Sequence, residues 1–352
     1  MKNVILFFLG VCQVVIVAAV DEVQINGAFS TGINAFHVSN DQQYKQVDLA
    51  FNLDFSVPVS EEIEGFFQLQ GAAGGSYLGF PGPEVVLTDL NMSYKPKGKL
   101  YSFLFGSFDT PFGQTISRLS NNADMSANMF VKNPLLYTTL AGYVGTLNTL
   151  GVLTTLDHSL ATTSIALTNG TAESASNDDG NFETVVRIKP HFKGLSDMSF
   201  SYLFSDDRGN AASFDTVFSG WVVDIDRELT DNVDVTAYFS RLTYDDLDGS
   251  TDNDIESLML EGRYHFAEFD IALRYDRYKR FDQSAVNSAI PTPFLSYSAL
   301  SAGQVFDVVE SYAFAYKRQL DKHVEFKAET FLEFSDFERQ VLGSLLYVTF
   351  FF

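Results

Sequence analysis

The sequence predicts an all-β protein, built as a single antiparallel transmembrane β-barrel of about 16 strands. Three observations predict this fold. Apolar residues recur at every second position in stretches of about ten residues, the period of a strand with one apolar and one polar face. The connections between these stretches alternate between short and long. The last stretch, residues 345–352, ends the chain on Phe352.

The first element along the chain is an apolar leader. Residues 1–3 give it a basic start, residues 4–19 are almost entirely apolar, and residues 17–19, Val-Ala-Ala, form an acceptable cleavage site. We therefore expect a signal peptide over residues 1–19 and the barrel domain over residues 20–352. A retained membrane anchor is the alternative, but the run of about 16 residues is shorter than the roughly 20 that a spanning helix needs.

Cysteine usage removes several kinds of chemistry. Cys12 is the only cysteine and would leave with the leader. It follows Val11, where a lipidation site needs a small residue, so lipidation is not expected. The mature chain then has no disulfide, no thiolate metal site and no cysteine nucleophile.

Composition limits the remaining function classes. A hydrophobic content of 46% and a mean hydropathy of +0.02 leave no room for membrane helices beyond the leader. A barrel escapes this average because it shows lipid one face and water the other. The formal net charge of -22 argues against nucleic acid, whose phosphates would be repelled.

Five stretches show the two-residue period clearly. In residues 47–55 the odd positions are Val, Leu, Phe, Leu and Phe, whereas Asp48, Asn52 and Asp54 occupy the other face. The other four stretches are residues 233–240, 258–266, 269–276 and 324–333. A soluble β-sandwich is the alternative, but it would not place charges opposite the apolar face of so many strands.

The candidate strands follow one another without a linker. They begin near Val23, Lys45, Ile63, Val85, Lys99, Gly142, Ser159, Asn181, Met198, Phe214, Val233, Asp254, Phe269, Gln304, His323 and Glu338. The facing of residues 101–108, 160–168 and 306–317 stays open. Short turns are expected at residues 58–60, 95–98, 157–158, 193–195, 229–232, 267–268 and 319–321. Long connections are expected at residues 71–84, 109–141, 168–180, 205–213, 245–253 and 281–303.

The longest connection follows a short motif. Residues 105–113 read Phe-Gly-Ser-Phe-Asp-Thr-Pro-Phe-Gly and lead into residues 109–141, the third connection on the long side. A secreted chain that closes on an aromatic strand resembles the outer-membrane barrels of Gram-negative bacteria. The Gly-x-Phe-Asp-x-Pro-Phe-Gly run resembles what precedes the inward-folded loop in several porin families. The chain therefore resembles a Gram-negative porin over the whole mature chain, although so short a motif names no substrate.

This resemblance implies a setting for the protein. The chain would reach the outer membrane through a Sec signal peptide, with both termini in the periplasm. Its C-terminal Phe350 and Phe352 would act as the signal to the barrel-assembly machinery. Membrane lipid and lipopolysaccharide would surround it, and a homotrimer would be the expected assembly. Acidic connections, such as residues 177–179 and 245–254, could meet lipopolysaccharide through Ca²⁺ or Mg²⁺, but they lack the spacing of a specific calcium loop.

The candidate site is the channel itself. The loop would narrow it with Asp109, Arg118, Asp124 and Lys132, which as an alternative are solvated surface charges. The wall would carry Asp48, Asp54, Glu64, Asp89, Glu183, Asp234, Glu261, Asp270, Asp276, Glu325, Glu329 and Glu333, with the cations Arg187, Lys189, Arg263, Arg274 and Lys327. The arginine ladder of general porins is absent, because these cations are scattered among carboxylates. We expect each wall carboxylate to be an ordinary wetted group, and the acidic excess predicts a mild cation preference.

No catalytic or cofactor motif is present. The histidines His37, His158, His191, His265 and His323 are far apart, and no phosphate-binding loop or haem-attachment site occurs. An outer-membrane lipase with Ser240 or Ser257 near His265 is left open. The sequence predicts a passive diffusion channel for small hydrophilic solutes or ions, without enzyme activity, cofactor or metal. The alternative is a structural or partner-binding barrel with no open pore, such as an adhesin or a sheath around an electron-transfer partner.

Overall fold

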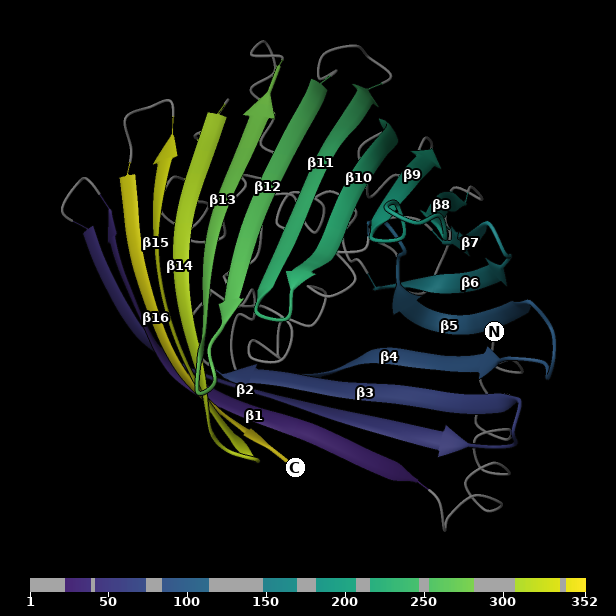
Figure 1. The fold of residues 1–352 in the computed structure, drawn as a ribbon, viewed down its shortest axis with the longest axis horizontal. Helices are drawn as coiled ribbons and strands as arrows, with labels where there is room; N and C mark the ends of the chain where they lie inside the picture. The colour runs from purple at the N-terminus through teal and green to yellow at the C-terminus, as the bar shows by residue number, and fades with distance from the viewer. Residues whose placement is uncertain are drawn as a thin grey trace.

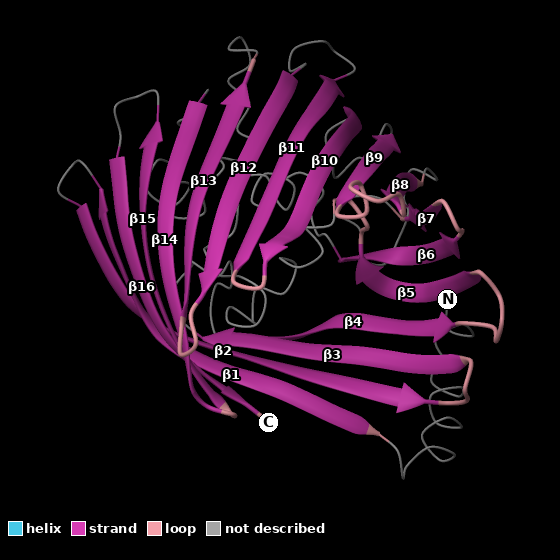
Figure 2. Cartoon of the chain, viewed as in Figure 1, coloured by secondary structure: helices cyan, strands magenta, loops and turns pink. Residues whose placement is uncertain are grey.

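A computed structural model describes residues 23–38, 42–73, 84–113, 148–169, 182–206, 216–246, 253–281, 308–335 and 340–352. These residues form a closed barrel in which each strand pairs antiparallel with the next (Figure 1). They contain strands and turns and no helix (Figure 2). Among the same residues, no helix has the length and apolar character needed to cross a membrane.

The barrel has 16 described strands, and their bounds follow the expected order. They are β1 (Gln24–Val38), β2 (Gln42–Pro58), β3 (Ile63–Ala73), β4 (Glu84–Tyr94), β5 (Tyr101–Asp109), β6 (Asn148–Asp157), β7 (Ala161–Thr168), β8 (Glu183–Pro190), β9 (Met198–Asp206), β10 (Thr216–Thr230), β11 (Val233–Asp246), β12 (Asn253–His265), β13 (Asp270–Arg280), β14 (Val308–Asp321), β15 (Val324–Ser335) and β16 (Gln340–Phe351). The predicted strands are thus confirmed in number and order. The predicted starts at Gly142 and Gln304 lie outside the described residues, and the described parts of β6 and β14 begin at Asn148 and Val308.

Pairing of the first and last strands closes the barrel. β1 and β16 pair from Ala28↔Phe351 to Val38↔Val341. Gly27 and Phe352 exchange two backbone hydrogen bonds of 3.0 Å each, and the Phe351 N–H donates to the His323 carbonyl in the β14–β15 turn. Both described ends of the chain therefore lie at the rim formed by the short turns, which we call the short-turn end. The long connections leave the strands at the opposite rim. Two further connections at that rim, residues 39–41 and 336–339, are short.

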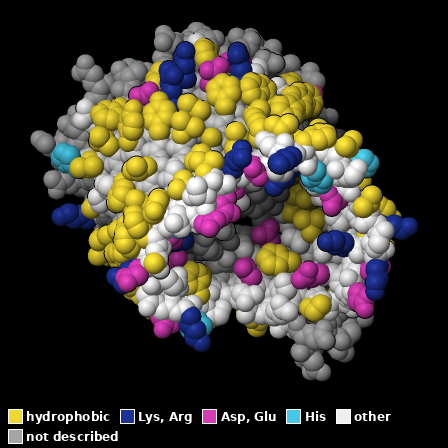
Figure 3. Space-filling model, in the orientation of Figure 1, with side chains coloured by type: hydrophobic (Ala, Val, Ile, Leu, Met, Phe, Trp, Pro, Cys, Tyr) yellow, Lys and Arg dark blue, Asp and Glu magenta, His cyan; other side chains and the backbone are white. Residues whose placement is uncertain are grey.

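The two faces of the wall alternate as predicted. In β15, Glu325, Lys327, Glu329 and Glu333 are buried on the inner face. The outer face shows large apolar side chains such as Leu273, which is 62% exposed. Figure 3 shows such side chains in a band across the upper part of the outer surface. An apolar exterior on a closed barrel is the surface that lipid solvates, so the soluble sandwich is excluded.

Aromatic rings mark two levels of this outer surface. Tyr264, Phe266, Phe269, Tyr316 and Phe326 form a row of neighbouring rings at the short-turn end of β12–β15, with centroids 4.4 to 6.4 Å apart. Further along the same strands, Tyr275 and Tyr312 lie 5.1 Å apart and Tyr312 and Phe334 lie 6.2 Å apart. Rows of this kind flank the apolar band of barrels in membranes.

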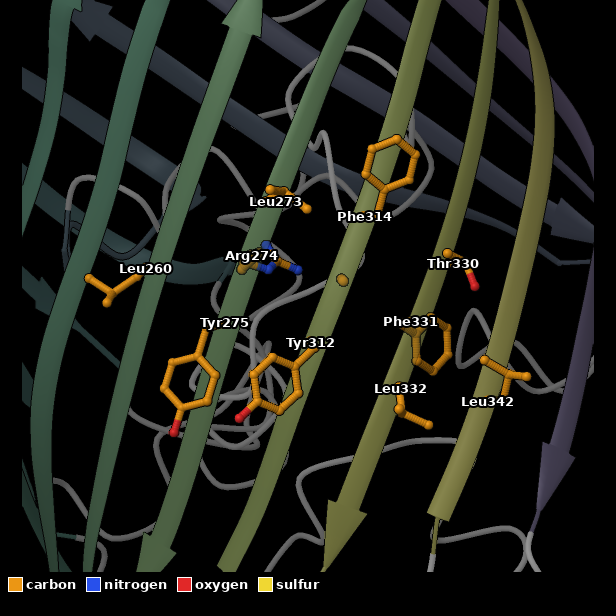
Figure 4. Close-up of a pocket in the computed structure, with 11 residues that line it drawn as sticks. Leu260, Leu273, Arg274, Tyr275, Tyr312, Phe314, Thr330, Phe331, Leu332 and Leu342 are labelled. Atoms are coloured by element: carbon orange, nitrogen blue, oxygen red, sulfur yellow. The ribbon is translucent and has the colours of Figure 1, made fainter.

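Between these rows the outer face of β12–β16 has a shallow hollow of about 520 Å³ (Figure 4). Its lining is mostly apolar and includes Leu260, Leu273, Phe314, Leu332 and Leu342. The hydroxyl of Thr330 in this lining donates to the Gly343 carbonyl at 3.0 Å. Even this polar group is satisfied within the wall, as a lipid-facing position requires.

The inner face is less uniformly polar than the sequence predicted. Val341, Leu345 and Tyr347 of β16 and Phe331 of β15 are buried there. Tyr347 lies against Gly32 and Phe331 against Gly343, so closely that a Cβ at either glycine would come within 2.1 Å of the ring. The glycines make room for large side chains that lie along the wall, and this part of the interior is packed rather than wet.

Candidate functional site: the inner wall and the segment after β5

The motif that ends β5 places its residues inside the barrel. Phe108 and Phe112 are 3% and 0% exposed. The Gly113 N–H donates to Ser201 Oγ at 3.0 Å. Ser201 belongs to the inner face of β9, which is separated from β5 by β6, β7 and β8. Because the segment after β5 reaches a wall that is not adjacent to it, residues 110–113 run across part of the interior.

Glycine is required at two positions of the motif, Gly106 and Gly113, for different physical reasons. Gly113 has a φ of 79°, which turns the chain toward β9 at little cost only for glycine. Gly106 has a φ of 117° and lies opposite Asn91 in β4. A Cβ at Gly106 would come within 2.2 Å of the Leu90 carbonyl oxygen, so only glycine lets β4 and β5 approach this closely.

Most of the predicted constriction lies beyond the described part of the chain. Asp109 is the last residue of β5, and its side chain is outside the description. Arg118, Asp124 and Lys132 also lie outside the described residues.

A chain of charges crosses the middle of the inner wall from β10 to β13, and we call it the central chain. Arg263 lies 3.5 Å from Asp226 and 2.9 Å from Glu261. Arg274 lies 3.5 Å from the other oxygen of Glu261 and 3.0 Å from Asp276. The side chains of Arg274 and Asp276 are only 2% and 1% exposed, so the pairing takes place away from water.

A second chain of charges, the mouth chain, crosses five strands at the short-turn end. His265 Nε2 lies 2.8 Å from Asp234, and its Nδ1 lies 2.9 Å from Asp270. Lys317 lies 3.8 Å from Asp270 and 3.8 Å from Glu325. Exposure is higher here than in the central chain, from 20% at Lys317 to 33% at His265, although Glu325 is 7% exposed. One residue from each of β11–β15 thus builds an alternating row that water reaches.

The other predicted wall residues divide by strand. Lys327 pairs with Glu329 at 3.7 Å on β15. On β8, Arg187 lies opposite Ser201 and Lys189 lies opposite Thr162. Asp89 lies opposite Gln68, whose amide donates to Asp54 at 2.7 Å. The side chain of Asp48 on β2 is outside the description.

The expectation that the wall carboxylates are ordinary wetted groups is wrong for the described centre of the wall. Asp276, Glu329 and Glu333 are at most 4% exposed, and Asp276 and Glu329 pair with Arg274 and Lys327. The reason is position, since each pair joins residues two positions apart on the inner face of one strand, where opposite charges lie side by side and cover one another. A carboxylate buried this way needs its partner, because the desolvation cost is otherwise uncompensated.

Sequence reasoning missed Asp226, Lys317 and Ser201 as wall residues. The alternation of Asp224 and Asp226 in β10 was a usable signal, because both fall on the face of buried Val222. Lys317 lies in the one stretch of β14 whose facing was left open. The role of Ser201 as an acceptor depends on a contact 88 residues away, which no local pattern contains.

Charge on the described inner wall is unbalanced. β10–β15 carry ten inner-face carboxylates, Asp224, Asp226, Glu228, Asp234, Glu261, Asp270, Asp276, Glu325, Glu329 and Glu333, beside the four cations Arg263, Arg274, Lys317 and Lys327 and the imidazole of His265. Figure 3 shows acidic side chains around a hollow near the centre of the view. The described inner wall of these strands therefore carries an excess of negative charge.

The lipase arrangement left open by the sequence is not formed by these residues. Ser240 and Ser257 face each other across β11 and β12. His265 is eight positions further along β12 than Ser257, roughly 26 Å at the rise of a strand. Both its ring nitrogens are also occupied by Asp234 and Asp270. Within the described ranges, no three His, Cys, Asp or Glu side chains are grouped as metal ligands.

Comparison with known proteins places this fold among outer-membrane channels. No protein-family model and no curated protein sequence matches the chain. Among solved structures, the outer membrane channel DcaP of Acinetobacter baumannii has a TM-score of 0.64 at 14% identity, covering 94% of this chain and 97% of that one. An anion-selective porin from Comamonas acidovorans has a TM-score of 0.65 at 9% identity, covering 94% and 99%. OmpT of Vibrio cholerae, in its trimer form, has a TM-score of 0.61 at 9% identity, covering 94% and 99%. The chain therefore has the porin-like barrel fold.

Proposed function

We propose that this protein is an outer-membrane porin, a passive diffusion channel for small hydrophilic solutes or ions. The third long connection, residues 109–141, narrows the channel from inside. The observation that carries the proposal is the hydrogen bond from Gly113 to Ser201, because it holds the start of this connection against the inner wall of a distant strand. Similarity to DcaP and to an anion-selective porin supports a channel as the use of this fold.

The setting belongs to the same proposal. The leader, residues 1–19, directs the chain across the inner membrane, and the barrel then inserts into the outer membrane with the short-turn end in the periplasm. Lipid and lipopolysaccharide surround its apolar band. We also propose a homotrimer, supported by the trimer form of OmpT. The mass of the detergent-solubilised protein tests the proposed trimer, and the mass of a monomer would contradict it.

Mild cation preference is the finer part of the proposal. The acidic excess on the inner wall supports it, and a neighbouring fold that is anion-selective shows that the barrel alone does not set the sign. Selectivity must come from the particular side chains that an ion meets along its path.

Planar-bilayer recording tests the channel and its selectivity together. The purified barrel should give discrete conductance steps, and a KCl gradient should give a reversal potential on the cation-selective side. Deleting residues 118–132 should raise the single-channel conductance, because the shortened connection then narrows the channel less. Asp109→Asn with Asp124→Asn should lower the cation preference.

The outcomes separate the two candidate functions. Folded protein that stays silent in the bilayer favours the structural or partner-binding barrel. Steps whose size is unchanged by the deletion would remove the loop from the constriction while leaving the channel in place.

A further inference from the structure

The central chain and the mouth chain differ in what a passing ion can reach. In the central chain Glu261, Arg274 and Asp276 are 7%, 2% and 1% exposed, and each is held in an ion pair. A hydrated ion cannot contact groups so thoroughly covered. In the mouth chain Asp234, Asp270 and Lys317 are 26%, 24% and 20% exposed. Arg263 and Asp226 of the central chain are 17% and 12% exposed, so the most accessible charges of the two chains are those at the short-turn end.

His265 occupies the middle of the accessible part of this row. Its Nδ1 and Nε2 each face a carboxylate oxygen, of Asp270 at 2.9 Å and of Asp234 at 2.8 Å. An ionised carboxylate only accepts hydrogen bonds, so the ring must donate from both nitrogens. An imidazole that donates from both nitrogens carries two protons and a positive charge.

The charge of the mouth chain depends on this proton. With His265 charged, the chain has three carboxylates, Asp234, Asp270 and Glu325, against two cations, His265 and Lys317, a net charge of 2 − 3 = −1. With a neutral imidazole the same chain has a net charge of 1 − 3 = −2. Among side chains at their ordinary values, histidine alone makes this change between about pH 5 and pH 8.

The surroundings of His265 contain one other nearby cation on the same strand. Arg263 lies opposite Asp234 in register but pairs with Glu261 and Asp226. On β10, Glu228 lies opposite Asp234, and on β14, Lys317 pairs with Asp270. His265 is thus the one histidine of the mouth chain, whose other members are carboxylates and a lysine.

We propose that His265, held between Asp234 and Asp270, determines the charge selectivity of the channel at its short-turn mouth. When the imidazole loses its proton, the mouth becomes more negative and passes cations over anions more strongly. This inference rests on the proposed channel function, and it places a selectivity determinant apart from the loop that narrows the channel.

The test is the ratio of K⁺ to Cl⁻ permeability, taken from reversal potentials in a KCl gradient at about pH 5 and about pH 9. The native barrel should show a ratio about twofold higher at the upper pH, as expected for one unit charge partly screened by water and salt. His265→Gln should have the higher ratio at both pH values. His265→Lys should keep the lower ratio at both, because its charge does not change in this range.

His323→Gln is the matched control. His323 lies at the same end but in the β14–β15 turn, where its Nδ1 contacts the Phe351 carbonyl at 3.1 Å. This variant should keep the full response of the native barrel to pH. If His265→Gln gives no channels, the ratio of His265→Lys at the upper pH decides alone.

Two results would overturn the inference while the channel function stands. One is a native permeability ratio that is the same at both pH values. The other is a His265→Gln or His265→Lys channel that keeps the native response. A barrel that gives no conductance steps in any form would instead overturn the proposed function itself.

Discussion

At the scale of single residues, the inner wall shows why buried charges come in sets. Arg274 is fully enclosed, and Glu261 and Asp276 lie within 3.5 Å of it. Each of these groups has lost its water and depends on the others for compensation. The exposed pair of Arg318 and Glu268, 3.0 Å apart at the short-turn end, has no such dependence, because water solvates both groups.

This contrast predicts the cost of removing one cation. Arg274→Met should lower the free energy of unfolding by about 3 kcal/mol or more, because it removes the cation 3.0 Å from the buried carboxylate of Asp276. Arg318→Met should lower it by less than about 1 kcal/mol. Urea unfolding followed by the fluorescence of Trp221, the only tryptophan of the chain, measures both. Equal losses of unfolding free energy in the two variants would show that the buried charges of the central chain do not depend on Arg274 for compensation.

At the scale of elements, close contact between neighbouring strands depends on glycine. Gly106 and Gly98 both have positive φ values, 117° and 71°. They differ in space, since a Cβ at Gly106 would meet the Leu90 carbonyl at 2.2 Å whereas nothing lies within 4 Å of one at Gly98. Gly98 therefore serves a turn, and Gly106 serves the contact between β4 and β5.

The pair gives a matched test of this reading. Gly98→Ala should cost about 1 kcal/mol of stability, the usual penalty for a side chain in a left-handed conformation. Gly106→Ala should cost at least about 3 kcal/mol or prevent folding, because it adds overlap with the β4 backbone to the strain. The midpoint of urea unfolding measures the difference. Similar stability losses in the two variants would mean that β4 can move away from β5 without a further loss of stability.

At the scale of the whole molecule, the last residue, Phe352, has a structural role in addition to its predicted role in barrel assembly. Phe352 exchanges two backbone hydrogen bonds with Gly27 and its ring packs against that glycine. These contacts complete the ring of strands. The side chain itself is 61% exposed, so its own contribution to stability is small.

Phe352→Ala separates closure from assembly. The variant keeps the backbone hydrogen bonds, so the purified barrel should lose less than about 1 kcal/mol of stability and refold in detergent. In cells, its folded amount in the outer membrane should fall to a minor fraction of the native amount, if Phe352 is read by the assembly machinery. Native amounts in the membrane would contradict the predicted signal.

The sequence alone determined the barrel, a strand number of about 16 and which residues of β12, β13 and β15 face inward. It could do so because successive side chains of a strand point to opposite faces. In residues 258–276 and 324–333 the apolar positions therefore indicate the lipid-facing side and the polar positions the inner side. The predicted starts of β6 and β14, at Gly142 and Gln304, lie outside the described residues.

Only the tertiary structure decided which charges meet. The row from Asp234 through His265, Asp270 and Lys317 to Glu325 joins residues of five strands, and their heights depend on the register of every intervening pair. The contact of Gly113 with Ser201 likewise depends on the curvature that brings β9 opposite β5. Local sequence fixes the face on which a side chain lies, whereas its neighbours across the sheet are set by closure of the whole ring.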